Sequence, residues 1–144
     1  MWAMTSAKVL VIDDEHMIRW SIEQTLRAAG HQVVSAESAA SGKALAREFQ
    51  PDIVFLDLRL PDQDGLAVLK EMRCTHGRKL RVIVMTAFGE GGTAAEAMKL
   101  GAYAYLQKPF DFDQIEGTVR RALGEAVGAQ PDADSDPRKP PVPT

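Results

Sequence analysis

The sequence predicts a doubly wound α/β domain in which five parallel strands alternate with five helices. Short runs rich in β-branched residues alternate with amphipathic stretches of helical period, and turn or capping residues separate them. Elements that alternate in this way build a parallel sheet covered by helices on both faces. The length of 144 residues and the hydrophobic content of 45% suit one such domain.

The first half of the chain contains two pairs of strand and helix. Residues 8–12 form an apolar run typical of a buried parallel strand. Residues 16–29 come next as a helix, because apolar side chains recur every four residues and Gly30 can close its end. Residues 33–34 are a weak strand, and residues 38–49 form a second helix. The buried side of this second helix is predicted to carry Ala40, Ala44, Leu45 and Phe49.

The second half repeats the alternation. We expect a strand at 53–56, a turn-rich loop at 58–65, a helix at 66–74, a strand at 82–85, a helix at 93–100 stopped by Gly101, a strand at 103–106 and a last helix capped by Asp111. These elements place one folded domain at 8–127, after an N-terminal extension at 1–7. Residues 128–144 are rich in proline and aspartate, and we expect a disordered tail or linker there.

The composition argues against several functional classes. A formal net charge of −3, without a basic block after a recognition helix, argues against direct nucleic-acid binding. Cys74 is the only cysteine, so an intramolecular disulfide is impossible and a zinc site lacks its ligands. No apolar window approaches the roughly 18 residues of a membrane span. We therefore expect a cytoplasmic protein that does not enter a membrane.

Four polar signals directly follow predicted strands. They are Asp13 with Asp14, Asp57, Thr86, and Lys108 before Pro109. Because the carboxyl ends of parallel strands meet at one edge of a sheet, these side chains are expected to form one acidic site with a single lysine. Carboxylates this close repel one another, so a positive ion must compensate, and their hard oxygens favour Mg²⁺.

The cluster indicates phosphoryl chemistry. A carboxylate can attack phosphorus and form an aspartyl phosphate while a metal ion and a lysine screen the charge. Asp57 is the best candidate because it ends the most apolar strand, whereas the neighbours Asp13 and Asp14 suit metal binding. The Thr86 hydroxyl could donate to a phosphoryl oxygen. Each signal alone could be a turn, a helix cap or a strand end, and only their coincidence favours a functional site.

With these residues in place, residues 4–127 resemble the receiver domain of two-component response regulators. The matching stretches are Val9-Leu-Val-Ile-Asp-Asp-Glu15, Val54-Phe-Leu-Asp-Leu-Arg-Leu-Pro-Asp62 with Asp64-Gly65, Val84-Met-Thr-Ala87, and Gly101-Ala-Tyr-Ala-Tyr-Leu-Gln-Lys-Pro-Phe110. Ile18-Arg-Trp20, Thr86-Ala-Phe-Gly89 and Met98-Lys-Leu-Gly-Ala-Tyr103 are most similar to receivers of NtrC-type sigma-54-dependent activators. The resemblance implies a flavodoxin-like (CheY-like) fold with strand order 2-1-3-4-5.

The resemblance also implies roles for the site residues. Asp57 would accept phosphate from a sensor histidine kinase. Asp14 and Asp57 would ligate Mg²⁺ directly, Asp13 would assist through water, and Arg59 would offer its backbone carbonyl. A cis peptide between Lys108 and Pro109 would aim the lysine into the site.

A switch is the further implication of the resemblance. The phosphoryl oxygens would draw in the Thr86 hydroxyl, and Tyr105 would turn inward behind it. The face formed by the fourth helix, fifth strand and fifth helix would then change partners. This face admits a homodimer, or an output domain or protein that controls transcription and is expected outside this chain.

Two other classes are weighed against this interpretation. A Mg²⁺-dependent phosphohydrolase also uses an aspartyl phosphate, but it would carry a second carboxylate where Arg59 stands and an insertion to cover its substrate. A receiver-like domain that is never phosphorylated is disfavoured by the presence of Asp57, Thr86 and Lys108 together. Gly91 and Gly92 are a departure from the family pattern, and they should loosen the start of the fourth helix.

Overall fold

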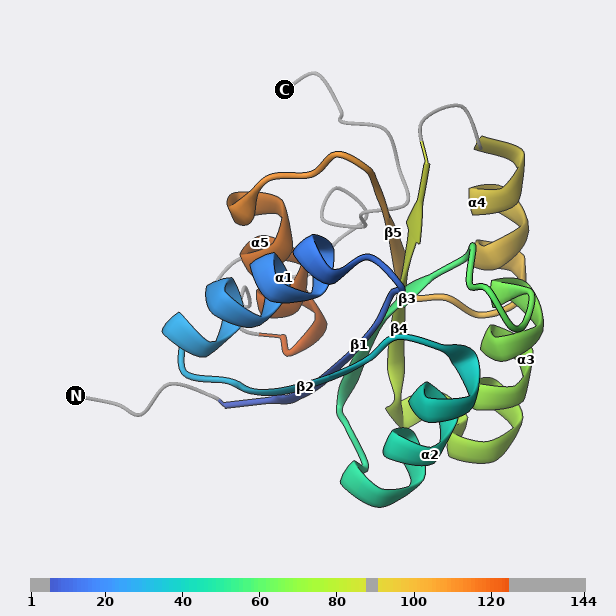
Figure 1. The fold of residues 1–144 in the computed structure, drawn as a ribbon, viewed down its shortest axis with the longest axis horizontal. Helices are drawn as coiled ribbons and strands as arrows, with labels where there is room; N and C mark the ends of the chain where they lie inside the picture. Colours follow the sequence, from blue (N-terminus) through green and yellow to red (C-terminus); the bar gives the residue numbers. More distant parts are fainter. Residues whose placement is uncertain (1–5, 88–90, 125–144) are drawn as a thin grey trace.

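The computed structural model describes residues 6–87 and 91–124, which form one five-stranded parallel sheet between two layers of helices (Figure 1). In chain order the elements are β1 (Lys8–Ile12), α1 (His16–Ala28), β2 (Gln32–Ala36), α2 (Ala39–Phe49), β3 (Ile53–Asp57), α3 (Gly65–His76), a 3₁₀ turn (Gly77–Lys79), β4 (Arg81–Thr86), α4 (Gly91–Lys99), β5 (Ala104–Gln107) and α5 (Phe112–Ala122). The predicted alternation of five strands with five helices is confirmed.

The strands lie in the order β2-β1-β3-β4-β5, and every neighbouring pair is parallel. This confirms the order 2-1-3-4-5. Helices α1 and α5 cover one face of the sheet, and α2, α3 and α4 cover the other (Figure 1). The chain leaves β1 toward β2 on one side and returns to β3 on the other. The loops after β1 and β3 therefore run in opposite directions. They leave an open site beyond the carboxyl ends of these two strands.

The central strands contribute side chains to two hydrophobic cores, which explains why their sequences are continuous apolar runs. In β1, Val9 and Val11 lie in the core beneath α1 and α5. Leu10 and Ile12 lie in the core beneath α2, α3 and α4. Each fully buried aliphatic side chain contributes about 1.5–3 kcal/mol relative to an exposed one. The sheet is thus fixed from both faces and gives the residues at its carboxyl edge a rigid support.

Helix ends follow the local signals of the sequence. Gly30 and Gly101 lie two residues after the last residue of α1 and of α4, and their φ values of 97° and 106° fall in a region that favours glycine. At the start of α5, the Asp111 side chain accepts a hydrogen bond from the Gln114 amide, and the Gln114 side chain accepts one from the Asp111 amide. This reciprocal capping box confirms the predicted role of Asp111.

The predicted buried side of α2 is wrong at Ala40, which is exposed. The helix instead buries Ala39, Gly42 and Ala46. A Cβ atom at Gly42 would lie 2.5 Å from Ile12 Cδ1, so α2 approaches β1 this closely because the residue is glycine. Glycine carries no hydrophobic signal, and the apolar pattern of the sequence therefore predicted the buried side of α2 incorrectly.

Several boundaries differ from the predicted ones. β2 spans five residues rather than two, α3 extends to His76, and α4 begins at Gly91 rather than at Thr93. β5 is shifted by one residue and leaves out Tyr103. Pairing with the neighbouring strands β1 and β4 sets the limits of β2 and β5, and local β propensity does not reveal that pairing.

Parts of the predicted organisation lie outside the described residues. These are the first five residues of the N-terminal extension, Phe88 and Gly89 of one matching stretch, the last three residues of the 8–127 domain, and the tail at 128–144. The domain limits therefore stay predictions. Within the described part of the chain, every helix is too short or too polar to cross a bilayer.

Candidate functional site

The predicted polar residues lie along the carboxyl edge of the sheet. Asp13 follows β1, Asp57 ends β3, Thr86 ends β4 and Lys108 follows β5. One carboxylate oxygen each from Asp13, Asp14 and Asp57 lies within 4.8 Å of the others, close enough to hold a metal ion together. The parallel order of the strands thus gathers into one cluster residues that are far apart in the sequence.

Lys108 is the cation of this cluster. Its Nζ lies 2.8 Å from Asp13 Oδ2 and 3.5 Å from Asp57 Oδ2, with a side chain only 17% exposed. A third carboxylate, Glu15, lies 3.3 Å from the same nitrogen. Glu15 was assigned no role from the sequence, although it directly follows the Asp-Asp pair. The peptide bond between Lys108 and Pro109 is cis.

Asp13 and Asp14 are adjacent in sequence and differ in environment. The Asp13 side chain is fully buried, and its Oδ1 accepts a hydrogen bond of 2.8 Å from the Glu15 amide. Its backbone is held as well, because the Arg19 guanidinium donates to the Asp13 carbonyl at 2.9 Å. Asp14 is exposed at the mouth of the site. One carboxylate is thus fixed by the protein, and the other is open to solvent.

Asp57 carries the clearest electrostatic signature of the site. Burial and the negative charge of Asp13 raise the pKa of Asp57 to about 6, against the opposing effects of the Arg59 amide and Lys108. The Arg59 amide donates to Asp57 Oδ1 at 3.1 Å. For Lys108, burial lowers the pKa, but the hydrogen bond to Asp13 and the charges of Asp13 and Asp57 outweigh burial and raise it above its ordinary value. The carboxylates therefore outnumber the local positive charge, and a bound cation would relieve the excess.

Arg59 lies in the loop between β3 and α3. Its backbone pairs with Asp64 in an isolated antiparallel bridge, and the Gly65 amide donates to the Leu58 carbonyl at 3.1 Å. A Cβ atom at Gly65 would lie 2.4 Å from Leu58 Cα, so this closure needs glycine. The loop after Asp57 is therefore narrow and closed at its base.

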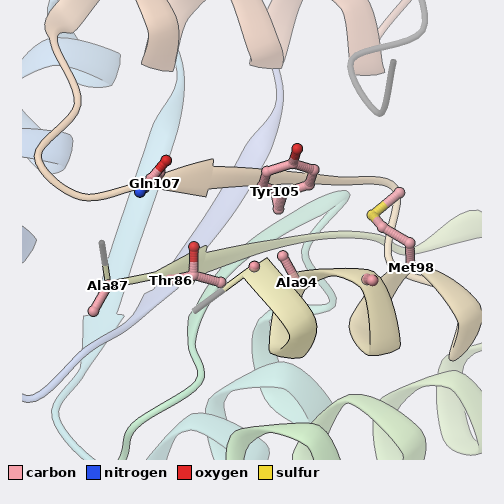
Figure 2. A pocket seen from close by; sticks show the side chains of 8 residues that line it. Thr86, Ala87, Ala94, Met98, Tyr105 and Gln107 are labelled. Carbon is pink, nitrogen blue, oxygen red and sulfur yellow. The ribbon is translucent and has the colours of Figure 1, made fainter. Parts of the chain in front are cut away.

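Thr86 and Tyr105 line one pocket beside the acidic cluster. The pocket has a volume of about 380 Å³, and α4 contributes Ala94 and Met98 to its wall. Thr86 is buried, and the residue before it, Met85, pairs with Asp57. Tyr105 is 36% exposed. Figure 2 shows its ring on the β5 side of the pocket with the hydroxyl directed away from α4, whereas Thr86 lies on β4 between Ala87 and Ala94.

The chain matches known proteins over most of its length. Residues 9–120 match the family model described as the response regulator receiver domain. The regulatory protein AtoC of Escherichia coli is 38% identical over 116 residues, which are 81% of this chain and 25% of AtoC. Sporulation initiation phosphotransferase F of Bacillus subtilis is 34% identical over 83% of this chain and 96% of its own length.

A solved structure agrees with these relatives. The crystal structure of NtrX from Brucella abortus superposes with a TM-score of 0.80 and 35% identity, over 85% of this chain and 28% of NtrX. The chain thus spans about a quarter of the length of AtoC and of NtrX. Both the family and the fold predicted from the sequence are confirmed. The chain belongs to the response regulator receiver domains of two-component signalling, and its relatives include the NtrC-type transcription regulators.

Proposed function

We propose that Asp57 accepts a phosphoryl group from a sensor histidine kinase in the cytoplasm. The observation that carries this proposal is the position of Lys108, whose ammonium lies between Asp13 and Asp57 at the open edge of the sheet. Phosphorylation then changes the face formed by α4, β5 and α5. That face acts on an output domain or protein, or on a second copy of the chain, to control transcription.

The acceptor step uses the ionised form of Asp57. One carboxylate oxygen attacks phosphorus, the new O–P bond forms, and the bond between phosphorus and the donor breaks with its electron pair leaving on the donor. A pKa of about 6 leaves Asp57 mostly ionised at neutral pH. The Arg59 amide orients this carboxylate through Oδ1.

The donor set fits Mg²⁺. Three carboxylates offer hard oxygen atoms within 4.8 Å of one another, and Asp14 opens to solvent, where an ion could keep part of its water shell. We assign Asp14, Asp57 and the Arg59 carbonyl as direct ligands and Asp13 as an assisting one. Mg²⁺ bound there would neutralise the carboxylates and screen the phosphoryl oxygens.

Two residues detect the new charge. Lys108 already contacts Asp57 at 3.5 Å and would pair with a phosphoryl oxygen. Thr86, which ends the neighbouring strand, would donate its hydroxyl. The pocket between Thr86 and Tyr105 gives the Tyr105 ring a space to enter. The exposed and inward positions of Tyr105 would then be the two states of the switch.

Incubation with Mg²⁺ and acetyl phosphate, followed by mass spectrometry of the intact protein, tests the acceptor role. We expect one added phosphoryl group in the wild type and none in Asp57→Asn. Asp52→Asn is a matched control, because Asp52 also accepts a backbone hydrogen bond but lies at the other end of β3. An unmodified wild type would refute the proposal.

The lifetime of the adduct separates a signalling switch from a hydrolytic enzyme. We expect slow loss of the phosphoryl group from Asp57 by self-hydrolysis rather than the repeated turnover of a catalytic cycle. Rapid turnover of small phosphomonoesters would favour a phosphohydrolase instead.

A further inference from the structure

Asp62, at the tip of the loop between β3 and α3, joins this loop to the start of α2. Its Oδ1 accepts a hydrogen bond of 2.8 Å from the Ala39 amide, and its Oδ2 accepts one of 3.0 Å from the Ala40 amide. These amides belong to the first turn of α2, where they have no partner within the helix. Both hydrogen bonds lower the pKa of Asp62, so its carboxylate is ionised at neutral pH and the contacts are charge-assisted.

The next residue of the loop strengthens the same connection. Gln63 Oε1 accepts a hydrogen bond of 2.7 Å from Lys43 Nζ on α2, and Gln63 Nε2 donates to Glu71 Oε2 on α3 at 2.7 Å. Lys43 and Glu71 also pair directly at 2.9 Å. The loop tip is therefore tied to two helices by side chains that lie outside the acidic cluster.

These contacts connect the loop that follows Asp57, through α2, to the segment that contains Asp13. At its base the loop is closed by the bridge between Arg59 and Asp64, so a displaced tip would also displace the Arg59 backbone. At the other end, α2 comes directly after β2, and the last residue of β2, Ala36, accepts a hydrogen bond of 3.1 Å from the Asp13 amide. Asp62 thus connects the segment after Asp57 to the segment that holds Asp13.

We propose that Asp62 is a positioning residue for the metal site, because it fixes the loop that carries Arg59 relative to Asp13. This inference rests on the proposed function and adds to it a residue that the sequence marks only as a turn former. Asp62 is not one of the carboxylates that could hold the ion, and both of its oxygens accept hydrogen bonds from α2 instead. Its effect is on how well the Arg59 carbonyl and Asp57 are placed when Mg²⁺ binds.

Calorimetric titration with Mg²⁺ alone tests the proposal. In Asp62→Asn one oxygen still accepts, but an NH₂ group faces the second amide of α2. We expect the Kd for Mg²⁺ to rise about threefold to tenfold, which is less than the roughly 10–100-fold typical when a residue that directly supports a metal ligand is lost. Glu37→Gln is the charge-matched control: it removes one negative charge from the same end of α2 and leaves both Asp62 contacts in place. We expect that variant to stay within about twofold of the wild type.

Hydrogen exchange on the wild type provides a second measurement that needs no variant. Coupling between two sites is reciprocal, so Mg²⁺ should slow exchange at the Ala39 and Ala40 amides if their bonds to Asp62 support the metal site. Equal Mg²⁺ affinity in Asp62→Asn and Glu37→Gln, or unchanged exchange at both amides, would overturn the inference while Asp57 phosphorylation stays intact. A wild type that binds no Mg²⁺ would overturn the inference and the proposed metal site together.

Discussion

Lys108 and Asp13 are separated by 95 positions in the sequence, yet Lys108 Nζ lies 2.8 Å from Asp13 Oδ2. Asp13 is fully buried, so its charge has lost most of its hydration. The buried charge depends on Lys108 and on the Glu15 amide for compensation. The contact thus joins β1 to the segment after β5, and it makes the stability of the fold depend on the site.

Lys108→Met should destabilise the protein, because it keeps the aliphatic stem but leaves the Asp13 charge without its cation. In Mg²⁺-free buffer we expect the free energy of unfolding in urea to fall by about 2–4 kcal/mol. Mg²⁺ should restore part of the loss, since binding to the folded state stabilises it. The control is Arg120→Met, which breaks an exposed pair with Glu116 at 4.0 Å and should cost less than about 1 kcal/mol. Equal losses in the two variants would contradict this account.

Asp57 should make stability fall as pH rises. Its pKa is raised from 3.8 to about 6 in the folded protein, so the folded state binds the proton more tightly than the unfolded state. This stabilisation is complete below pH 3.8 and is lost as pH rises through about 6. At about pH 7.5, without Mg²⁺, Asp57→Asn should therefore be more stable than the wild type, by up to about 3 kcal/mol.

Urea titrations at about pH 7.5 and about pH 4.5 check this prediction. The advantage of Asp57→Asn should shrink at the lower pH, where the wild-type carboxyl is mostly protonated. An advantage of the same size at both values would mean that the gain has another cause, such as altered packing.

The sequence predicted the fold and the position of the cluster because both depend on local patterns. Apolar runs that end in Asp13, Asp57, Thr86 and Lys108 place these residues at one sheet edge wherever the strands are parallel. The contact of Glu15 with Lys108 was missed because it depends on side-chain reach across the site. The buried Gly42 was missed because a close helix-to-strand approach leaves no hydrophobic signal in a glycine.

Gly65→Ala should be strongly destabilising. The new Cβ would lie 2.4 Å from Leu58 Cα and 2.8 Å from the Leu58 carbonyl carbon and oxygen, and these are backbone atoms that cannot rotate away. We expect a loss of about 1–3 kcal/mol. Gly92→Ala is the matched control, because nothing lies within 4 Å of its Cβ position in α4. It should stabilise the protein by about 0.5–1 kcal/mol, since alanine is the better helix former. If Gly65→Ala left the free energy of unfolding unchanged, the loop between β3 and α3 could open without loss of stability, and this account would be wrong.

Thr86→Val should separate phosphorylation from the switch. Valine keeps the shape of the buried threonine and removes the hydroxyl that would donate to a phosphoryl oxygen. The variant should still gain one phosphoryl group, because Asp57 and Lys108 are intact. Amide chemical shifts near Asp57 should then change on phosphorylation, whereas those of Tyr105 and Ala94, across the pocket, should change much less than in the wild type.

The control for this experiment is Thr118→Val. Thr118 is as buried as Thr86, but its hydroxyl donates to the Gln114 carbonyl within α5 at 2.7 Å and takes no part in the acidic cluster. Its phosphorylated form should show shift changes at Tyr105 and Ala94 like those of the wild type. If phosphorylated Thr86→Val also shows them at full size, the signal does not pass through the Thr86 hydroxyl. The coupling to β5 would then have to run through Lys108, whose amide already donates to the Thr86 carbonyl at 2.7 Å.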